Sequence, residues 1–453
     1  MSYLFITTFA LLAWWRSVLC GRSVDDIPTE MKIGHIRTIY KCGKTPFATF
    51  KSFIHVIGIS GTVKNIHFDH AISLVQHCIV SCLIHWCLGG NQISLLAAIL
   101  FAIHPVNNQG VAWCNGKRYA QNTALTLLMY RFVPVGILIY FFIPFVQANA
   151  ILAPVLLLFK GFWQIVLITP LIGLLGYKRL KVWYEGRAVP LRKDGVYFSN
   201  DPRKIISFFK LFSFYFWHCL VPHNYGFFYG YGFYYTSKKS AADKMYKIDA
   251  EFFAGIVTFL AVAVATYMNI HNAIGFGLFW FILFISQYCG FRVISQLIAD
   301  RFCYLPNVGL QFAVAGVLVK FCVVPYIFPF LIALYIVQSW IVVRQFDSME
   351  AIHDYNIHYH PTCPKSYLYK HIKLSNEVNV VKALYWIQRV TDTLPNDGYG
   401  WYLYAVCLMN IHRDKESLDC FKKAVERMEP YQYNKEERNI INFINMINER
   451  NKK

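Results

Sequence analysis

The chain has 453 residues, of which 56% are hydrophobic, 17% aromatic and only 15% charged. This composition, with a mean hydropathy of +0.37, excludes an ordinary soluble protein and indicates a multi-pass membrane protein. The formal charge of +19 does not indicate nucleic-acid binding, because the basic residues are dispersed and form no stripe between aromatic side chains. A membrane surface or a lipid-phosphate ligand accounts for them better.

Apolar segments near the roughly 20 residues that a helix needs to cross a bilayer recur along the first three quarters of the chain. The first lacks a positively charged start and has Arg16 at its end, which favours a retained anchor over a signal peptide. We therefore predict an all-α, polytopic membrane helix bundle over residues 1–345. Its about 11 spans are 3–20, 70–88, 91–104, 119–130, 132–147, 150–176, 205–221, 251–268, 272–289, 308–322 and 326–343.

Beyond Val343 the apolar runs stop and a charged tail with helical spacing follows. Pro361, Pro395 and Pro430 recur at intervals of 34 and 35 residues, a period typical of tetratricopeptide (TPR) repeats. We predict a short TPR-type α-solenoid over residues 346–453, with a C-terminal capping helix from Lys435. Such repeats serve either as a structural appendage or as a groove for an extended polypeptide. The expected packing positions are Ala383, Trp386, Trp401, Ala405, Leu418, Phe421 and Ala424.

The run LFAIHPVNNQGVAWCNGKRY, Leu100 to Tyr119, places a histidine, amides and two adjacent cations between two apolar segments. Polar groups at a membrane boundary are costly, so they usually serve a site. His104 either hydrogen-bonds within that site or caps the preceding span.

Further motifs follow in order. They are PFATFKSF and NIHFDHAISLVQHCIVSCLIHW before this run, then Trp217–Pro222 with Tyr225, then IADRFCYLPNVG, and finally Arg344 with Asp347. Together with HPVNNQGVAWCNGKR, these segments resemble, from end to end, the polytopic GT-C type glycosyltransferases with C-terminal TPR repeats. That family includes animal O-mannosyltransferases and many bacterial relatives.

The resemblance implies a sugar, mannose in the animal members, moved from a polyprenyl-phosphate donor to a protein hydroxyl or a glycan, with inversion. The acceptor polypeptide would use the TPR groove. The resemblance also places loops 21–68, 105–118, 222–250 and 290–307 and the repeats on the luminal or periplasmic face, in the endoplasmic reticulum membrane or a bacterial inner membrane. Loop charge argues the other way, because the outward loops then carry more Lys and Arg than the inward ones.

Sugar transfer needs a base for the acceptor proton and cations or a metal for the leaving phosphate. Asp25 and Asp26 stand just after the first span, where GT-C enzymes keep an acidic residue, and are the predicted catalytic pair. Arg301, beside Tyr304, is the predicted donor-phosphate ligand because guanidinium binds phosphate through two parallel donors. Lys117, Arg118 and Lys160 are weaker candidates for the phosphate.

No metal site is predicted. His353, His358, His360 and Cys363 match no standard zinc spacing, although a divalent ion at the donor phosphate stays open. Gly226 to Tyr235, an aromatic run, is either an interfacial belt or a wall for sugar rings.

Three positions depart from the family pattern: Gln109 replaces a Glu, Tyr119 an Asp, and Gly161 the Glu of a Lys-Glu pair that begins at Lys160. An amide orients a hydroxyl but does not take its proton. The alternative function is therefore an inactive GT-C-fold scaffold that binds a lipid or a polypeptide through its repeats. A transporter is disfavoured because no internal repeat relates two halves of the apolar region.

Overall fold

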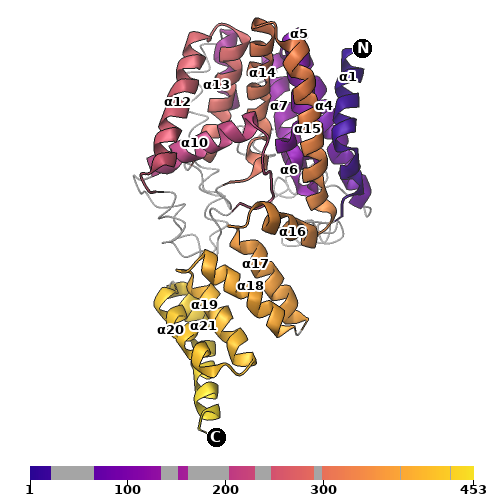
Figure 1. The fold of residues 1–453 in the computed structure, drawn as a ribbon. Coiled ribbons are helices and arrows are strands. Elements are labelled where there is room, and N and C mark those ends of the chain that lie inside the picture. Colours follow the sequence, from indigo (N-terminus) through magenta and orange to yellow (C-terminus); the bar gives the residue numbers. More distant parts are fainter. Residues whose placement is uncertain are drawn as a thin grey trace, which may run out of the picture.

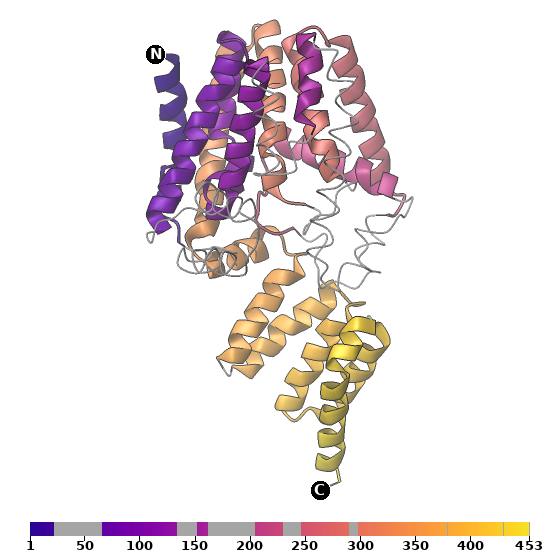
Figure 2. The ribbon, with the colours of Figure 1, turned by 180° about the vertical axis from the view of Figure 1, so that it is seen from behind.

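The protein is described by a computed structural model covering residues 1–21, 66–133, 152–161, 204–229, 246–289, 298–377, 379–428 and 430–452. These residues form α-helices and short 3-10 helices, without a strand. Figures 1 and 2 show an upright helical bundle that carries the N-terminus, with a smaller stack of helices below it that ends at the C-terminus.

The bundle consists of upright helices and one inclined helix, α10 (Figure 1). In chain order it contains α1 (Ser2–Trp14) continued by η1 (Trp15–Leu19), α4 (Ile66–Cys87), α5 (Gln92–Ile103), α7 (Lys117–Arg131), η6 (Ala153–Lys160), α10 (Lys204–Leu220), α12 (Ala250–Met268), α13 (Ala273–Ile285) continued by η9 (Ser286–Tyr288), α14 (Tyr304–Lys320) and α15 (Val324–Val343). The prediction of an all-helical protein holds for these residues.

Four of the described helical segments are long and apolar enough to cross a membrane: Ser2–Leu19, Ile66–Cys87, Ala250–Met268 and Val324–Asp347. Shorter apolar helices at Gln92–Ile103, Ile205–Leu220 and Ala273–Tyr288 coincide with three further predicted spans. Most of the predicted spans 132–147 and 150–176 lies outside the described residues. The described part of 150–176 contains a 3-10 helix, Ala153–Lys160, followed by Gly161, whose φ of 76° lies in the left-handed region.

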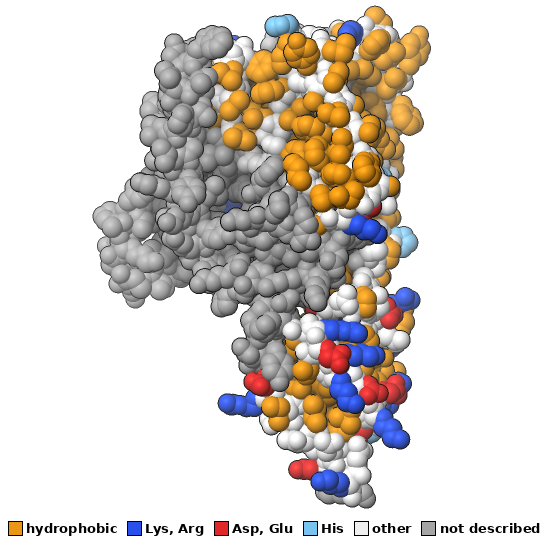
Figure 3. Space-filling model, turned by 90° about the vertical axis from the view of Figure 1, so that its left-hand side faces the viewer, with side chains coloured by type: hydrophobic (Ala, Val, Ile, Leu, Met, Phe, Trp, Pro, Cys, Tyr) orange, Lys and Arg blue, Asp and Glu red, His pale blue; other side chains and the backbone are white. Residues whose placement is uncertain are grey.

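The outer face of the bundle is apolar where a membrane would contact it. On α12, Phe253, Val257, Leu260 and Val264 lie one turn apart and are each more than half exposed. On the face that Figure 3 shows, apolar side chains gather over the described upper part and charged side chains over the described lower part. An apolar surface of this extent is typical of a protein that contacts lipid.

Helix ends and close contacts explain the local geometry. Asn91 caps α5 by accepting the Ser94 N–H at 3.0 Å, and Pro105 follows the last residues of the helix. α13 and α14 pack backbone to backbone where Gly277 meets Gly309, because a Cβ on Gly277 would lie 2.4 Å from the Gly309 carbonyl oxygen.

Below the bundle, helices pack on one another in sequence order (Figure 1). They are η11 (Arg344–Asp347), α16 (Met349–Tyr359), α17 (Pro364–Asn376), α18 (Val380–Thr393), α19 (Gly398–Asn410), α20 (Asp414–Arg427) and α21 (Pro430–Arg450). Phe346, Ile352 and Cys363 belong to the apolar core of the bundle, whereas separate cores begin at Tyr367. α16 is thus shared between the bundle and the helices α17–α21, which are called the repeat region below.

The bundle end that faces the repeat region is called the repeat-side end. α1 and η1 finish there, because Arg16 pairs with Asp347 at 2.7 Å and Cys20 Sγ lies 3.7 Å from the Val343 carbonyl oxygen. Gly21 and the loops that contain Asn108, Gly226 and Arg301 lie at this same end. No disulfide joins cysteines in the described part of the chain.

Candidate functional site

A buried carboxylate accepts hydrogen bonds from several segments at the repeat-side end. Asp300, in η10 (Asp300–Phe302), is fully buried. Its Oδ1 accepts from His218 Nε2 at 3.0 Å and from the Tyr229 hydroxyl. Its Oδ2 accepts from Asn108 Nδ2 at 2.6 Å and from the Gly226 N–H at 3.2 Å. Four donors from three distant segments therefore converge on one carboxyl group, as the burial of a charge requires.

Burial, and then the neighbouring Asp300, raise the pKa of Tyr229 well above its usual value. Its hydroxyl therefore stays protonated and donates to the carboxylate. The Gly226 N–H also donates to the Tyr229 hydroxyl oxygen, at 3.0 Å.

Arg301 completes a closed ring of hydrogen bonds with the same loops. Its Nη1 donates to Gln109 Oε1 at 2.8 Å, and Gln109 Nε2 donates to the Gly226 carbonyl oxygen at 3.0 Å. The Gly226 N–H in turn donates to Asp300, the residue before Arg301. The series of hydrogen bonds therefore closes into a ring. The guanidinium lies 5.5 Å from the ring centre of Trp113 and 5.0 Å from that of Phe302. Arg301 is thus held in one orientation, with 7% of its surface exposed.

Gln109 uses both ends of its amide in this ring, as donor and as acceptor. A Glu at this position has no donor for the Gly226 carbonyl oxygen when it is ionised. The two hydrogen bonds of Gln109 therefore require an amide at this position in this chain.

The segment 221–229, called the strap below, joins the site to α16. The Phe227 N–H donates to Gln345 Oε1 at 3.0 Å, and the Phe228 N–H donates to Asn356 Oδ1 at 3.2 Å. The Phe228 ring also stacks on the His353 ring, with centroids 5.4 Å apart. The aromatic run from Gly226 is therefore packed between bundle and repeats over its described part, and it is not an exposed belt there.

A second polar cluster lies at the start of α4 and α7. Lys117 Nζ donates to Asp69 Oδ1 at 2.8 Å, with 1% and 11% of the two side chains exposed. Beside this ion pair, Cys114 Sγ lies 3.5 Å from His70 Nδ1, and His70 Nε2 lies 3.1 Å from the Gly21 carbonyl oxygen. A Cβ on Gly116 would lie 1.8 Å from the Gln109 carbonyl oxygen, so this cluster and the ring pack closely.

The structure brings some predicted site residues together and separates others. Arg301 and Gln109 are in direct contact, whereas Lys117 belongs to the second cluster. The Tyr304 hydroxyl donates to His77 Nδ1 at 2.7 Å within the helix packing. Lys160 is exposed and lies 4.8 Å from the ring centre of Tyr130, near the C-terminal end of α7, away from the repeat side.

His104 lies just after α5 and makes two hydrogen bonds, the first of which caps η3 (Pro105–Asn107). Its Nδ1 accepts from the Val106 N–H at 3.2 Å, and its Nε2 lies 2.9 Å from the Cys219 carbonyl oxygen on α10. Arg118 is half-buried at the start of α7. Asp25 and Asp26 lie outside the described residues, so their predicted role stays a prediction.

Sequence reasoning missed Asp300, Asn108 and Tyr229, and it quoted His218 without giving it a role. The available signal was an acidic residue in an apolar context beside Arg301, since an ionisable group at a span boundary is a functional candidate by position alone. Within the described residues, no group of three or more His, Cys, Asp and Glu side chains could hold a metal ion.

No family model, no curated protein and no solved structure matches this chain.

Proposed function

We propose that the protein is a multi-pass membrane glycosyltransferase that moves a sugar from a polyprenyl-phosphate donor to a protein hydroxyl or a glycan. The chemistry takes place at the repeat-side end, on the luminal or periplasmic face. Asp25 or Asp26 acts as general base, and Arg301 holds the donor phosphate. The helices α17–α21 act as TPR repeats that present a polypeptide acceptor.

The observation that carries this proposal is the ring through Arg301, Gln109 and Gly226. It fixes a guanidinium at a membrane-boundary loop before any ligand arrives, which is what tight recognition of a phosphate requires. Asp300 supports the ring from behind, because it is saturated with donors and fully buried. Asp300 is therefore a positioning residue in this scheme. The acceptor hydroxyl gives its proton to Asp25 or Asp26.

The base is tested by transfer assays with the protein in proteoliposomes, using a polyprenyl-phosphate sugar and a hydroxyl-bearing peptide. Asp25→Asn and Asp26→Asn are compared with Glu30→Gln, which removes a carboxylate from the same segment. Loss of a general base lowers the rate by about 10²–10⁴-fold. We expect such a loss for at least one Asp variant, with normal membrane insertion, and no loss for Glu30→Gln. Wild-type rates for both Asp variants overturn the proposed base.

Gln109 supports a second candidate function, an inactive scaffold that binds a lipid or polypeptide. Where the resembled family has a carboxylate, this chain has an amide whose two ends are both engaged, so it cannot serve as a base. The scaffold predicts no transfer by the wild-type protein. It also predicts that Trp401→Ala, which removes the indole packed under Lys423 at 4.4 Å, weakens partner binding.

A further inference from the structure

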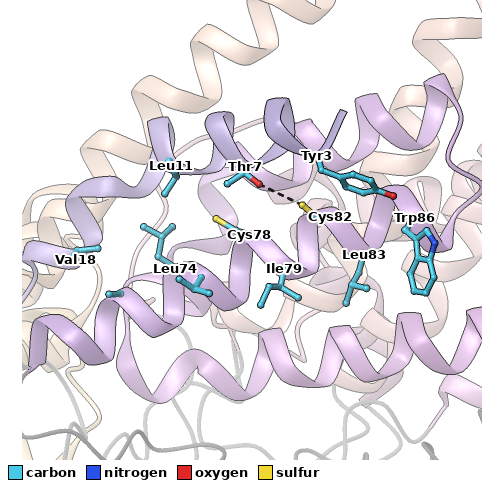
Figure 4. A pocket seen from close by; sticks show the side chains of 12 residues that line it. Tyr3, Thr7, Leu11, Val18, Leu74, Cys78, Ile79, Cys82, Leu83 and Trp86 are labelled. Carbon is cyan, nitrogen blue, oxygen red and sulfur yellow. Dashed lines mark hydrogen bonds between the residues drawn. The ribbon is translucent and has the colours of Figure 1, made fainter. Parts of the chain in front are cut away.

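A cavity of about 720 Å³ lies between α1 and α4 (Figure 4). Side chains from both helices line it, and Figure 4 shows Leu11 of α1 opposite Leu74 and Cys78 of α4. Its size lies in the range of pockets that hold a specific small ligand, roughly 300–1,000 Å³. It is called the α1/α4 groove below.

The chemistry of the groove matches hydrocarbon. None of the residues lining it carries a charge. In its middle, Thr7 Oγ1 and Cys82 Sγ lie 3.7 Å apart and form a weak hydrogen bond (Figure 4), and the other polar side chains, Tyr3 and Trp86, stand at one end. An extended peptide in this place would need partners for its backbone groups, and the lining offers almost none. A lipid chain needs none.

The length of the groove distinguishes between lipid chains. Its lining runs from Tyr3 to Val18, which at 1.5 Å per helical residue is about 22 Å. The hydrocarbon core of a bilayer is about 30 Å thick, so an acyl chain in one leaflet spans a depth of about 15 Å. The groove is therefore longer than one leaflet is deep, as suits a long isoprenoid chain.

The two ends of the groove differ. Tyr3 and Trp86 lie at the end away from the repeats, and Val18 and Ala71 lie at the repeat-side end. Ala71 follows His70, so this end adjoins the cluster in which Lys117 pairs with Asp69. A lipid whose chain fills the groove therefore has its head group beside the loop that leads through Gly116 to Gln109 and the Arg301 ring.

We propose that the α1/α4 groove binds the isoprenoid chain of a polyprenyl-phosphate lipid, with the phosphate at the repeat-side end. This inference rests on the proposed function for the identity of the lipid, and it names where that lipid lies. Binding of the chain requires no transfer of sugar, so the two claims fail separately.

The test uses polyprenyl phosphate without a sugar, with a photoactivatable diazirine on its chain, and the full-length protein in nanodiscs. Cross-linked peptides are mapped by mass spectrometry. We expect labels concentrated on residues 3–18 and 71–86, at least threefold above the lipid-exposed helix α12. Cys78→Phe, which fills the middle of the groove, should reduce this labelling at least fivefold. The matched variant Val264→Phe adds a ring on the exposed face of α12 and should leave it unchanged.

Several outcomes overturn the inference. Labelling of the groove no greater than that of α12 means that no chain is held there. Equal labelling by a phospholipid with a diazirine acyl chain means that the groove takes bilayer lipid without selecting isoprenoid. Cross-links between two copies of α1 or α4 assign the groove to a helix of a second copy. If the Cys78→Phe variant does not insert into the membrane, unlabelled polyprenyl phosphate is used to compete with the photoactivatable lipid on the wild-type protein. Groove labelling that the competitor does not reduce then overturns the inference. Groove labelling without any sugar transfer refutes the proposed function alone.

Discussion

Replacing Asp300 with Ala should destabilise the bundle far more than removal of an ordinary polar contact. The change leaves His218, Asn108 and Tyr229 without their common acceptor inside the protein. Removing one partner from a buried ion pair lowers the free energy of unfolding by about 3–5 kcal/mol. At about 2 °C per kcal/mol for a domain of 150–250 residues, the midpoint of thermal unfolding should fall by at least about 6 °C.

A matched control is Asn272→Ala, which removes the side-chain cap of α13, where Asn272 Oδ1 accepts the Ile274 N–H at 2.9 Å. A cap of this kind contributes about 1 kcal/mol, so its midpoint should fall by about 2–4 °C. The assay heats both variants in the same detergent and measures the fraction that still elutes as a folded monodisperse species. If Asp300→Ala lies within 2 °C of the control, by the same conversion, the carboxylate does not hold the loops together.

Three further changes probe the ring, the strap and the repeats. Gln109→Leu removes a charged hydrogen bond to Arg301 and leaves the Gly226 carbonyl oxygen without its partner. The free energy of unfolding should therefore fall by on the order of 3–5 kcal/mol. Gln109→Glu should lose part of this stability, measured by the same thermal assay. Gly226→Ala places a Cβ 2.5 Å from His360 Nε2, so it should speed hydrogen exchange in the strap and α16. Burial raises the pKa of Asp397 to about 7. The folded repeats therefore prefer the neutral acid, and their stability should fall as pH rises from about 4 to 7, by up to about 1.4 kcal/mol per pH unit. Asp397→Asn, which keeps a capping oxygen for the Gly400 N–H, should remove this dependence.

Each of these three predictions would be contradicted by a specific result. Gln109→Glu as stable as wild type means that the amide donor contributes nothing to the ring. Unchanged exchange in Gly226→Ala means that His360 moves aside without consequence. For Asp397, the quantity to compare is the difference in stability between wild type and variant from about pH 4 to 7. This difference is needed because burial lowers the pKa of His353 to about 3, which gives an opposite trend in both proteins. A constant difference contradicts the Asp397 account.

Local signals in the sequence predicted much of the fold. Asn91 and Pro105 bracket the apolar run that becomes α5, and the predicted span 91–104 differs from the helix by one residue at each end. The prediction for 308–322 began too late. α14 already starts at Tyr304, because Pro306 is tolerated in its first turn. Helix periodicity and caps are local properties, so a sequence reveals them directly.

The candidate site was only partly predictable, because it is built from contacts across the chain. The chemistry of guanidinium points to Arg301, and the departure from the family pattern points to Gln109, but their separation of 192 positions gives no sign that they touch. Asp300 was overlooked because its donors come from residues 108, 218, 226 and 229, which only the folded bundle brings together. Lys160, a weaker candidate for the phosphate, also supplies a cation, yet it lies at the C-terminal end of α7 beside Tyr130.

The most direct measurement of the central claim is sugar transfer by the wild-type protein itself. Purified protein in proteoliposomes is given an isotopically labelled polyprenyl-phosphate sugar and a peptide rich in Ser and Thr, and both products are followed by mass spectrometry. The account predicts that labelled sugar appears on the peptide in step with free polyprenyl phosphate, and that Arg301→Gln sharply reduces both. A folded, correctly inserted protein that binds the lipid but releases no phosphate product contradicts it.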